Sequence, residues 1–514
     1  MTFEIVFVLL SLLGMMAALI ADKMRPGMVL FSVVVLFLCV GILTPKEMLE
    51  GFSNKGMITV ALLFLVSEGI RQSGTLGQVI KKLLPQGKTT VFKAQLRILP
   101  SVAFISAFLN NTPVVVIFAP IIKHWAKSVK LPATKFLIPL SYVTILGGIC
   151  TLIGTSTNLV VHGMILEAGY EGFTMFELGK VGIFIAIAGI IYLFIFSKRL
   201  LPDARPDTAV PDEEVEEGEK LHRVEAVLGA RFPGINKKLS DFNFQRHYGA
   251  EVKEIKTRNG QRYVDHLEDV VLREGDTLVV MADDTFIPTW GESSVFVLLT
   301  NGNDPDTSGK KKRWLALILL VLMIVGATVG ELPATKEMFP DIKLDMFFFV
   351  CITTIIMAWT NIFPARKYTK YISWDILITI ACAFAISKAM VNSGVADCVA
   401  GFIIGLSDDY GPHVLLAILF VITNLFTELI TNNAAAALAF PLALSISAQL
   451  GVSPTPFFVV ICMAASASFS TPIGYQTNLI VQGIGNYKFT DFVRIGLPLN
   501  IITFLISVIL IPLI

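Results

Sequence analysis

The stretch Leu109-Asn110-Asn111-Thr112-Pro113, with Ala119-Pro120 shortly after it, interrupts an otherwise apolar segment that runs from Ile98 to Ile122. A proline next to a polar tip stops a continuous helix. Inside a membrane, such a break is tolerated only where the freed backbone lines a protected, wet cavity. Basic residues flank the segment at both ends, so we predict a re-entrant hairpin that enters the membrane and returns to the same side.

The interrupted segment belongs to a pattern that occurs twice. About 320 residues later the chain repeats it as Ile430-Thr431-Asn432-Asn433-Ala434, followed by Phe440-Pro441. Further pairs at nearly the same offset are Gln72-Ser73-Gly74 with Asn392-Ser393-Gly394, Ile153-Gly154-Thr155-Ser156-Thr157-Asn158-Leu159 with Ile473-Gly474-Tyr475-Gln476-Thr477-Asn478-Leu479, and Phe173-Thr174 with Phe489-Thr490. Matched blocks in the same order indicate an internal duplication, in which each half carries a polar hairpin tip and a second, interrupted helix.

The composition places these repeats in a membrane. Of the 514 residues, 54% are hydrophobic and 16% are charged, against roughly 25% charged residues in soluble domains. Apolar runs long enough to span a bilayer include Glu4 to Ala21, Gly27 to Leu43, Phe176 to Phe196 and Leu315 to Val329. No basic segment precedes the first run and no clear cleavage site follows it, so we expect it to remain as a membrane helix. The net charge of +1 gives no reason to expect a nucleic acid polymer as partner.

The basic loops predict the orientation of the two halves. The positive-inside rule places the clusters at Lys310 to Arg313 and at Arg366 to Lys370 in the cytoplasm. Two spans separate them, so the second hairpin enters from the outside. The predicted fold is therefore an all-α polytopic membrane protein with two inverted-topology repeats, each with a re-entrant hairpin and an interrupted helix. This architecture is typical of secondary transporters whose site lies at the repeat interface.

A charged insert separates the two membrane blocks. Residues 198–313 hold 40 of the 81 charged side chains. We predict a membrane block at 1–197 with the first repeat at about 57–197, a cytosolic insert at 198–313, and a membrane block at 314–514 with the second repeat at about 373–514. The insert begins with an acidic linker between Leu201 and Lys220 and continues as a small α/β domain at about 220–285. Within it we predict a short helix at Phe232 to Phe242 and strands at Ala250 to Lys256 and at Asp276 to Met281.

The repeated blocks predict a site for an anion carried with small cations. The N-termini of half-helices attract anions, and unwound carbonyls ligate cations. Asparagine and threonine side chains do both without burying a formal charge, which is costly at the bilayer centre. Ser106 and Thr427 each precede their motif by one helical turn, so their hydroxyls can face the tip. The alternative is that these polar residues only join helices together.

These motifs resemble the divalent anion/sodium symporter family of the ion transporter superfamily, over both membrane blocks. The family carries a Ser-Asn-Thr signature at its hairpin tips, and this chain keeps the central Asn111 and Asn432 with other residues around them. The resemblance implies a substrate site of Asn110, Asn111, Thr112, Thr155, Ser156, Thr431, Asn432, Asn433, Tyr475 and Gln476. It implies two sodium sites, one of Ser106, Asn110, Asn111 and Gly154, the other of Thr427, Ile430, Asn432 and Gly474.

The interrupted helices favour sulfate over dicarboxylates. Where dicarboxylate members of the family usually carry a Pro-Pro-Asn-like sequence, this chain has Thr155-Ser156-Thr157-Asn158 and Tyr475-Gln476-Thr477-Asn478, which look more like the algal and bacterial sulfate-transporting branch. We therefore predict sodium-coupled symport of a divalent inorganic anion, with sulfate first, by an elevator-type alternating access. The alternatives are a sodium- or proton-coupled di- or tricarboxylate transporter, with Glu68 and Glu428 as candidate proton carriers, and a ligand-regulated ion channel. No HExxH, GxSxG or Walker sequence occurs, so we do not expect an enzyme.

The insert resembles the regulatory RCK-C or TrkA-C domain of potassium-channel and Trk-type transport regulators. The resemblance rests on Leu272-Arg273-Glu274-Gly275-Asp276-Thr277-Leu278, which matches the Leu-x-x-Gly-Asp-x-Leu signature. It implies a homodimer and a small regulatory ligand such as a cyclic dinucleotide. No phosphate-binding glycine-rich loop is evident, so no ligand residue is assigned. We expect a multi-pass protein in contact with the lipid of the cell (inner) membrane, with the insert in the cytoplasm.

Overall fold

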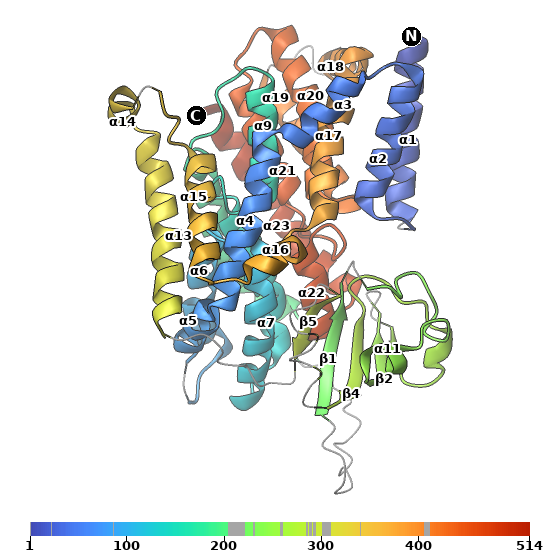
Figure 1. Cartoon of the computed structure of the whole chain (residues 1–514), viewed down its shortest axis with the longest axis vertical. Coiled ribbons are helices and arrows are strands. Elements are labelled where there is room, and N and C mark those ends of the chain that lie inside the picture. Colours follow the sequence, from blue (N-terminus) through green and yellow to red (C-terminus); the bar gives the residue numbers. More distant parts are fainter. Residues whose placement is uncertain are drawn as a thin grey trace, which may run out of the picture.

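A computed structural model gives the fold of the chain (Figure 1). It describes residues 2–21, 23–85, 87–203, 222–229, 232–257, 261–283, 286, 290, 295–300, 310–339, 341–405 and 412–513. Most of the predicted acidic linker, residues 204–221, lies outside the described residues, as does the end of the insert at 301–309.

Helices make up both membrane blocks. Before the insert they are α1 (Phe3–Ala21), α2 (Pro26–Val40), α3 (Pro45–Glu50), α4 (Lys55–Gln72), α5 (Thr75–Leu83), α6 (Val91–Ser106), α7 (Asn111–Ser128), α8 (Leu137–Gly148), α9 (Ser156–Glu167) and α10 (Gly179–Leu200). After it they are α13 (Lys310–Gly330), α14 (Pro333–Met338), α15 (Met346–Trp359), α16 (Tyr368–Tyr371), α17 (Trp374–Asn392), α18 (Val395–Gly405), α19 (Pro412–Leu429), α20 (Asn432–Leu450), α21 (Thr455–Ser466), α22 (Gln476–Gly485) and α23 (Phe489–Leu510). In the described part of the chain, seven helices are long and apolar enough to cross a membrane, which confirms the predicted polytopic helical protein.

Both repeated motifs break a helix where the sequence predicts it. The first hairpin is α6 and α7, which residues 107–110 separate, and the second is α19 and α20, which residues 430–431 separate. Pro113 lies in the first turn of α7, where its missing N–H leaves no intrahelical bond unmade. The second break of each half lies at residues 149–155, which separate α8 from α9, and at residues 467–475, which separate α21 from α22.

The two hairpins lie toward opposite ends of the helical block. In Figure 1 the pair α6 and α7 lies toward the end beside the sheet, and the pair α19 and α20 lies toward the far end. Elements of the two halves pack directly on each other, α22 against α7 and α20 against α9. The tips and the interrupted helices of both halves therefore meet in the interior of the block.

The insert is a small antiparallel sheet with a core of its own. Its strands are β1 (His222–Leu228), β2 (Glu251–Lys256), β3 (Arg262–Tyr263), β4 (Thr277–Ala282) and β5 (Phe296–Thr300), in the order β3-β2-β4-β1-β5. Phe232, Phe244, Tyr248 and Phe296 are buried together beneath the sheet. The predicted strands at Ala250 to Lys256 and Asp276 to Met281 are confirmed as β2 and β4.

The predicted helix at Phe232 to Phe242 is wrong. That segment forms turns and an isolated bridge, and the helix begins later, as α11 (Phe244–Tyr248). The side chain of Asn243 caps α11 by accepting a hydrogen bond from the Arg246 N–H. Asn236 lies in the left-handed region at a φ of 63°, which a helix does not allow.

The insert contacts the elements that carry the hairpin tip and the interrupted helix. The Lys123 ammonium of α7 lies 3.0 Å from a carboxylate oxygen of Glu225 on β1. The turn at Gly275 lies against Leu479 of α22, and Thr277 lies against Gly483 of the same helix. The sheet is thus docked on α7 and α22.

Candidate functional site

The phenol of Tyr475 joins the two halves at the centre of the predicted site. Asn111 donates a side-chain hydrogen bond to the Tyr475 hydroxyl at 2.5 Å, and the Thr155 hydroxyl lies 3.1 Å from it. The side chain of Asn432 lies next to the same phenol. Tyr475 is buried, so predicted substrate residues from both tips and both interrupted helices surround one hydroxyl group.

Two further contacts join predicted substrate residues across the halves. The Thr112 hydroxyl donates to the Gln476 side-chain oxygen at 3.3 Å. The Ser156 hydroxyl donates to the Asn433 side-chain oxygen at 3.3 Å, and Thr157, which the prediction omits, donates to the same oxygen at 3.1 Å. Each contact pairs a hairpin tip of one half with the interrupted helix of the other.

Four helix N-termini meet through these contacts. They belong to α7, α9, α20 and α22, and their N-cap residues are Asn110, Thr155, Thr431 and Tyr475. None of these four residues caps its helix with a side-chain hydrogen bond. The first N–H groups of each helix therefore keep their capacity to donate, and the positive ends of four helix dipoles face one region. This arrangement suits an anion.

The hydroxyls one turn before each tip form matching oxygen clusters. Ser106 Oγ lies 2.8 Å from Asn111 Oδ1 and 2.9 Å from the Thr144 carbonyl oxygen. Thr427 Oγ1 lies 2.8 Å from Asn432 Oδ1 and 2.6 Å from the Ala465 carbonyl oxygen. A hydroxyl has one hydrogen for two acceptors, so each cluster concentrates negative partial charge. Oxygen clusters of this kind suit a small cation such as sodium.

The predicted glycines leave room beside these clusters. A Cβ on Gly154 would come within 2.5 Å of the Gly148 carbonyl oxygen and within 3.0 Å of the Ala107 carbonyl oxygen. A Cβ on Gly474 would come within 2.6 Å of the Thr427 carbonyl oxygen. Only glycine lets these backbone segments approach so closely.

In each half, one asparagine hydrogen-bonds to the backbone at the break between the two interrupted helices. Asn158 donates to the carbonyl oxygens of Gly148 and Thr151 at 3.3 and 2.9 Å. Its counterpart Asn478 donates to those of Ser468 and Thr471 at 2.9 and 3.2 Å. These donors satisfy carbonyl groups that the break would leave unpaired.

Thr151 and Thr471 are a pair that the sequence prediction missed. Their hydroxyls donate to the carbonyl oxygens of Ala107 and Glu428, and each accepts from the N–H of Gly154 or Gly474. Each therefore ties a hairpin tip to the neighbouring break. The signal was present, because Thr151 and Thr471 extend the repeated Ile-Gly motif by two residues at the same offset.

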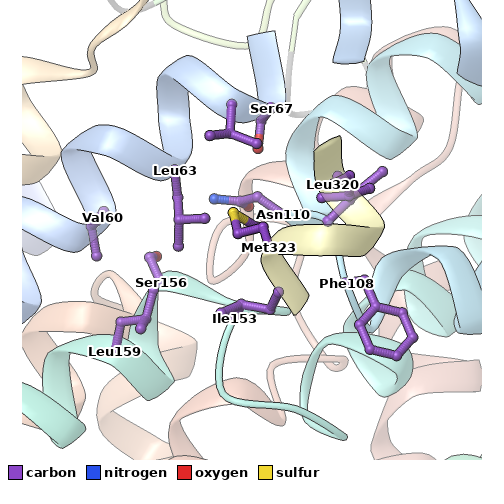
Figure 2. Close-up of a pocket in the computed structure, with 12 residues that line it drawn as sticks. Val60, Leu63, Ser67, Phe108, Asn110, Ile153, Ser156, Leu159, Leu320 and Met323 are labelled. Carbon is purple, nitrogen blue, oxygen red and sulfur yellow. The ribbon is translucent and has the colours of Figure 1, made fainter. Parts of the chain in front are cut away.

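Asn110 and Ser156 face a small cavity beside the tip (Figure 2). Val60, Leu63 and Ser67 of α4 and Leu320 and Met323 of α13 line its other sides. The cavity measures about 10 Å³, roughly the room that one water needs.

The remaining predicted residues lie at the second tip. Ile430 follows the last residue of α19 and is 5% exposed, whereas Thr431 is exposed. The structure thus brings Asn111, Thr112, Thr155, Ser156, Asn432, Asn433, Tyr475 and Gln476 together, while Asn110 and Thr431 stand at the edges.

The two candidate proton carriers have different partners. Glu68 forms a bidentate ion pair with Arg71 at 2.6 and 2.8 Å and accepts from Gln72 at 2.6 Å. Glu428 accepts from backbone N–H groups and from the Asn500 amide. Glu68 is therefore neutralised by a neighbouring side chain, and Glu428 is held by the second break.

Comparison with known proteins identifies the family. Residues 16–451 and 341–514 match the model of the citrate transporter (CitMHS) family. The chain belongs to the citrate transporter family. It is 30% identical to an uncharacterized transporter of Synechocystis, over 94% of this chain and 92% of that protein. Membership in the citrate transporter family makes the chain a multi-pass membrane transporter.

Relatives of this citrate transporter family protein carry names that differ in substrate. Sodium/sulfate cotransporter 2 of Chlamydomonas reinhardtii is 30% identical over 54% of this chain and 31% of its own length. The sodium-dependent dicarboxylate transporter SdcS of Staphylococcus saprophyticus is 25% identical over 28% of each chain.

Proposed function

We propose that the protein is a secondary active transporter that carries a divalent inorganic anion, with sulfate first, together with sodium. The observation that carries the proposal is the meeting of four uncapped helix N-termini around the Tyr475 hydroxyl. The side chains that meet there are neutral hydrogen-bonding groups. Helix dipoles and bound cations would then balance a doubly charged anion without a buried lysine or arginine.

The size of the site favours a compact anion. The Tyr475 ring stands in the second half where the first half has Thr155, and its hydroxyl touches both halves. A tetrahedral dianion needs donors on all sides within a short span, which the four N-termini and the Thr112, Thr155 and Ser156 hydroxyls supply. The relative named as a sodium/sulfate cotransporter supports this substrate.

A dicarboxylate or tricarboxylate is the second candidate substrate. The family name and the relative named as a sodium-dependent dicarboxylate transporter favour it. Carboxylates also bind at helix N-termini. A longer anion would need more room than the bulky Tyr475 leaves between the two tips.

Sodium is the proposed coupling ion. The oxygen clusters at Ser106 and Thr427 offer hydroxyl, amide and carbonyl oxygens without a formal charge, and the relatives named as sodium cotransporters support this ion. The pairing of Glu68 with Arg71 removes one candidate proton carrier.

Transport would proceed by alternating access between two inverted repeats, at about 57–197 and 373–514. The matching hydrogen bonds of the two halves and the opposite placement of the hairpins support this arrangement (Figure 1). The cavity beside Asn110 lies between the tip and the helices α4 and α13. An elevator-type movement of the tips and interrupted helices against α4 and α13 would open it.

The insert would regulate transport from the cytoplasm. Its docking on α7 and α22 supports a direct influence on the site. We further propose the RCK-C type of domain at about 220–285 within the insert at 198–313, with a small ligand such as a cyclic dinucleotide, in a homodimer in the cell (inner) membrane.

Uptake into proteoliposomes tests the proposal. Labelled sulfate should accumulate when sodium is present outside and not when choline replaces it. Unlabelled succinate or citrate in excess should leave sulfate uptake nearly unchanged. Uptake of succinate without sodium and without competition by sulfate would overturn both the substrate and the coupling ion.

A further inference from the structure

The Glu428 carboxylate lies at the edge of the second oxygen cluster, the one around the Thr427 hydroxyl. Its Oε1 accepts from the Ser470 N–H at 2.9 Å and from the Asn500 side-chain amide at 2.8 Å. Its Oε2 accepts from the Thr471 N–H at 3.0 Å and from the Ser468 hydroxyl at 3.4 Å. Both oxygens accept hydrogen bonds from N–H groups, so these contacts suit the ionised carboxylate.

The Ser468 hydroxyl connects this carboxylate to the predicted second sodium site. The Ser468 hydroxyl oxygen lies beside Gly474. A Cβ added to Gly474 would lie 2.6 Å from the Thr427 carbonyl oxygen and still closer to the Ser468 hydroxyl oxygen. When Ser468 donates its hydrogen to Glu428, its lone pairs remain for a cation between Thr427 and Gly474. Glu428 therefore both orients a ligand and adds charge behind it.

The first half has no counterpart of the Glu428 carboxylate or of the Ser468 hydroxyl. At the offset of the repeat, Glu428 corresponds to Ala107, and Ser468 corresponds to Gly148. Ala107 and Gly148 supply only backbone groups, and their carbonyl oxygens face Gly154. The two oxygen clusters match in their hydroxyl, amide and carbonyl contacts but differ in this one charge.

We propose that Glu428, acting through Ser468, makes the second-half cluster the tighter of the two sodium sites, so that it fills first. The inference rests on the proposed sodium coupling. A full negative charge one hydroxyl away attracts a cation more strongly than neutral oxygens do, because solvent screens little inside the protein. Glu428 is a positioning residue in this scheme, since Ser468 stands between it and the ion.

Sodium-dependent thermal stability of the purified protein in detergent tests the inference without transport. The melting temperature of the wild type should rise with sodium at constant ionic strength, with choline as the replacement, because ligands stabilise the folded state. Glu428→Gln should raise the half-saturating sodium concentration at least about fivefold, and Glu428→Asp should raise it less. Glu68→Gln is the matched control and should leave it unchanged, because Glu68 pairs with Arg71.

Double variants assign the effect to one site. Glu428→Gln should add nothing in a Thr427→Ala background but should keep its effect in a Ser106→Ala background. Should Glu428→Gln fail to fold, Ser468→Ala replaces it and should also raise the half-saturating concentration. A value within twofold of wild type for the variant that folds overturns the inference alone. A wild type that does not respond to sodium overturns the proposed coupling, and the inference with it.

Discussion

Asn111 and Tyr475 are 364 positions apart in the chain, and the Asn111 amide donates to the Tyr475 phenol oxygen at 2.5 Å. The contact joins the first hairpin tip to the interrupted helix of the second half. Asn111 Oδ1 at the same time lies in the oxygen cluster with Ser106. One asparagine therefore touches both the proposed cation site and the group at the centre of the proposed anion site.

Replacing either tip asparagine by alanine should abolish coupled uptake. In Asn111→Ala or Asn432→Ala, a buried hydroxyl loses one of its two acceptors, and in Asn111→Ala the Tyr475 phenol also loses its donor. Each lost hydrogen bond costs about 0.5–1.5 kcal/mol. We expect sulfate uptake in proteoliposomes to fall at least about tenfold, with an unchanged elution volume in size-exclusion chromatography. Asn392→Ala, which loses contacts with Ile42 and Glu47, should transport normally. Normal uptake by both tip variants would mean that the tips only join helices.

The Tyr475 ring should set the size of the accepted anion. Tyr475→Thr copies the residue of the first half, keeps a hydroxyl and removes the ring. We expect this variant to let succinate compete with sulfate for uptake. Tyr475→Phe keeps the ring and removes the hydroxyl, so it should lower sulfate uptake about tenfold without admitting succinate. Tyr192→Phe, whose hydroxyl donates to the Ile495 carbonyl outside the site, is the control. Unchanged selectivity in Tyr475→Thr would contradict this role.

The glycines at the two breaks should tolerate no side chain. In Gly154→Ala the new Cβ would meet two carbonyl oxygens, and in Gly474→Ala it would meet the Thr427 carbonyl oxygen. The backbone must shift, which moves oxygen atoms of the clusters, so the sodium-dependent rise in melting temperature should shrink in both. Gly14→Ala lies in α1 with no atom within 4 Å of its Cβ and should respond to sodium like the wild type. A full sodium response in both break variants would remove the clusters from cation binding.

The sequence predicted the breaks and the residues at them, and it could not predict their partners. The repeated motif located Asn111, Asn432 and the two Ile-Gly segments, because helix breaks in apolar runs have a clear local cause. The carbonyl oxygens of Thr144 and Ala465 carry no side-chain signal, and any residue there could supply them. The meeting of Asn111 with Tyr475 depends on how α22 packs on α7, which is a property of the tertiary fold.

In the insert, too, the sequence predicted individual strands but not the contacts between distant segments. Alternating apolar residues predicted β2 and β4, because one face of each strand packs on the aromatic core. The predicted helix at Phe232 to Phe242 was wrong because its apolar residues point into that core from turns. The docking of the sheet on α7 and α22 could not be predicted, since it rests on one ion pair and a few close contacts between residues far apart in the sequence.

The ion pair between Lys123 and Glu225 should make insert docking sensitive to acid. Burial alone would raise the pKa of Glu225, but the Lys123 and Lys256 ammonium groups outweigh it and hold the pKa at about 2, below the ordinary 4.5. The docked carboxylate therefore binds fewer protons than a free one. Its contribution is complete above about pH 4.5 and is lost as the pH falls toward 2. The protection factor of the β1 amides, which is the exchange rate corrected for the intrinsic rate at each pH, should fall over this range.

Lys123→Met and Glu225→Gln should each lower this protection at pH 7 by about 1–3 kcal/mol, and the effects in the double variant should be less than additive. Lys127→Met, an exposed lysine on the same helix, should leave β1 protected. Additive effects of Lys123→Met and Glu225→Gln, or equal β1 protection factors at pH 7 and pH 3, would show that the pair does not hold the insert to α7.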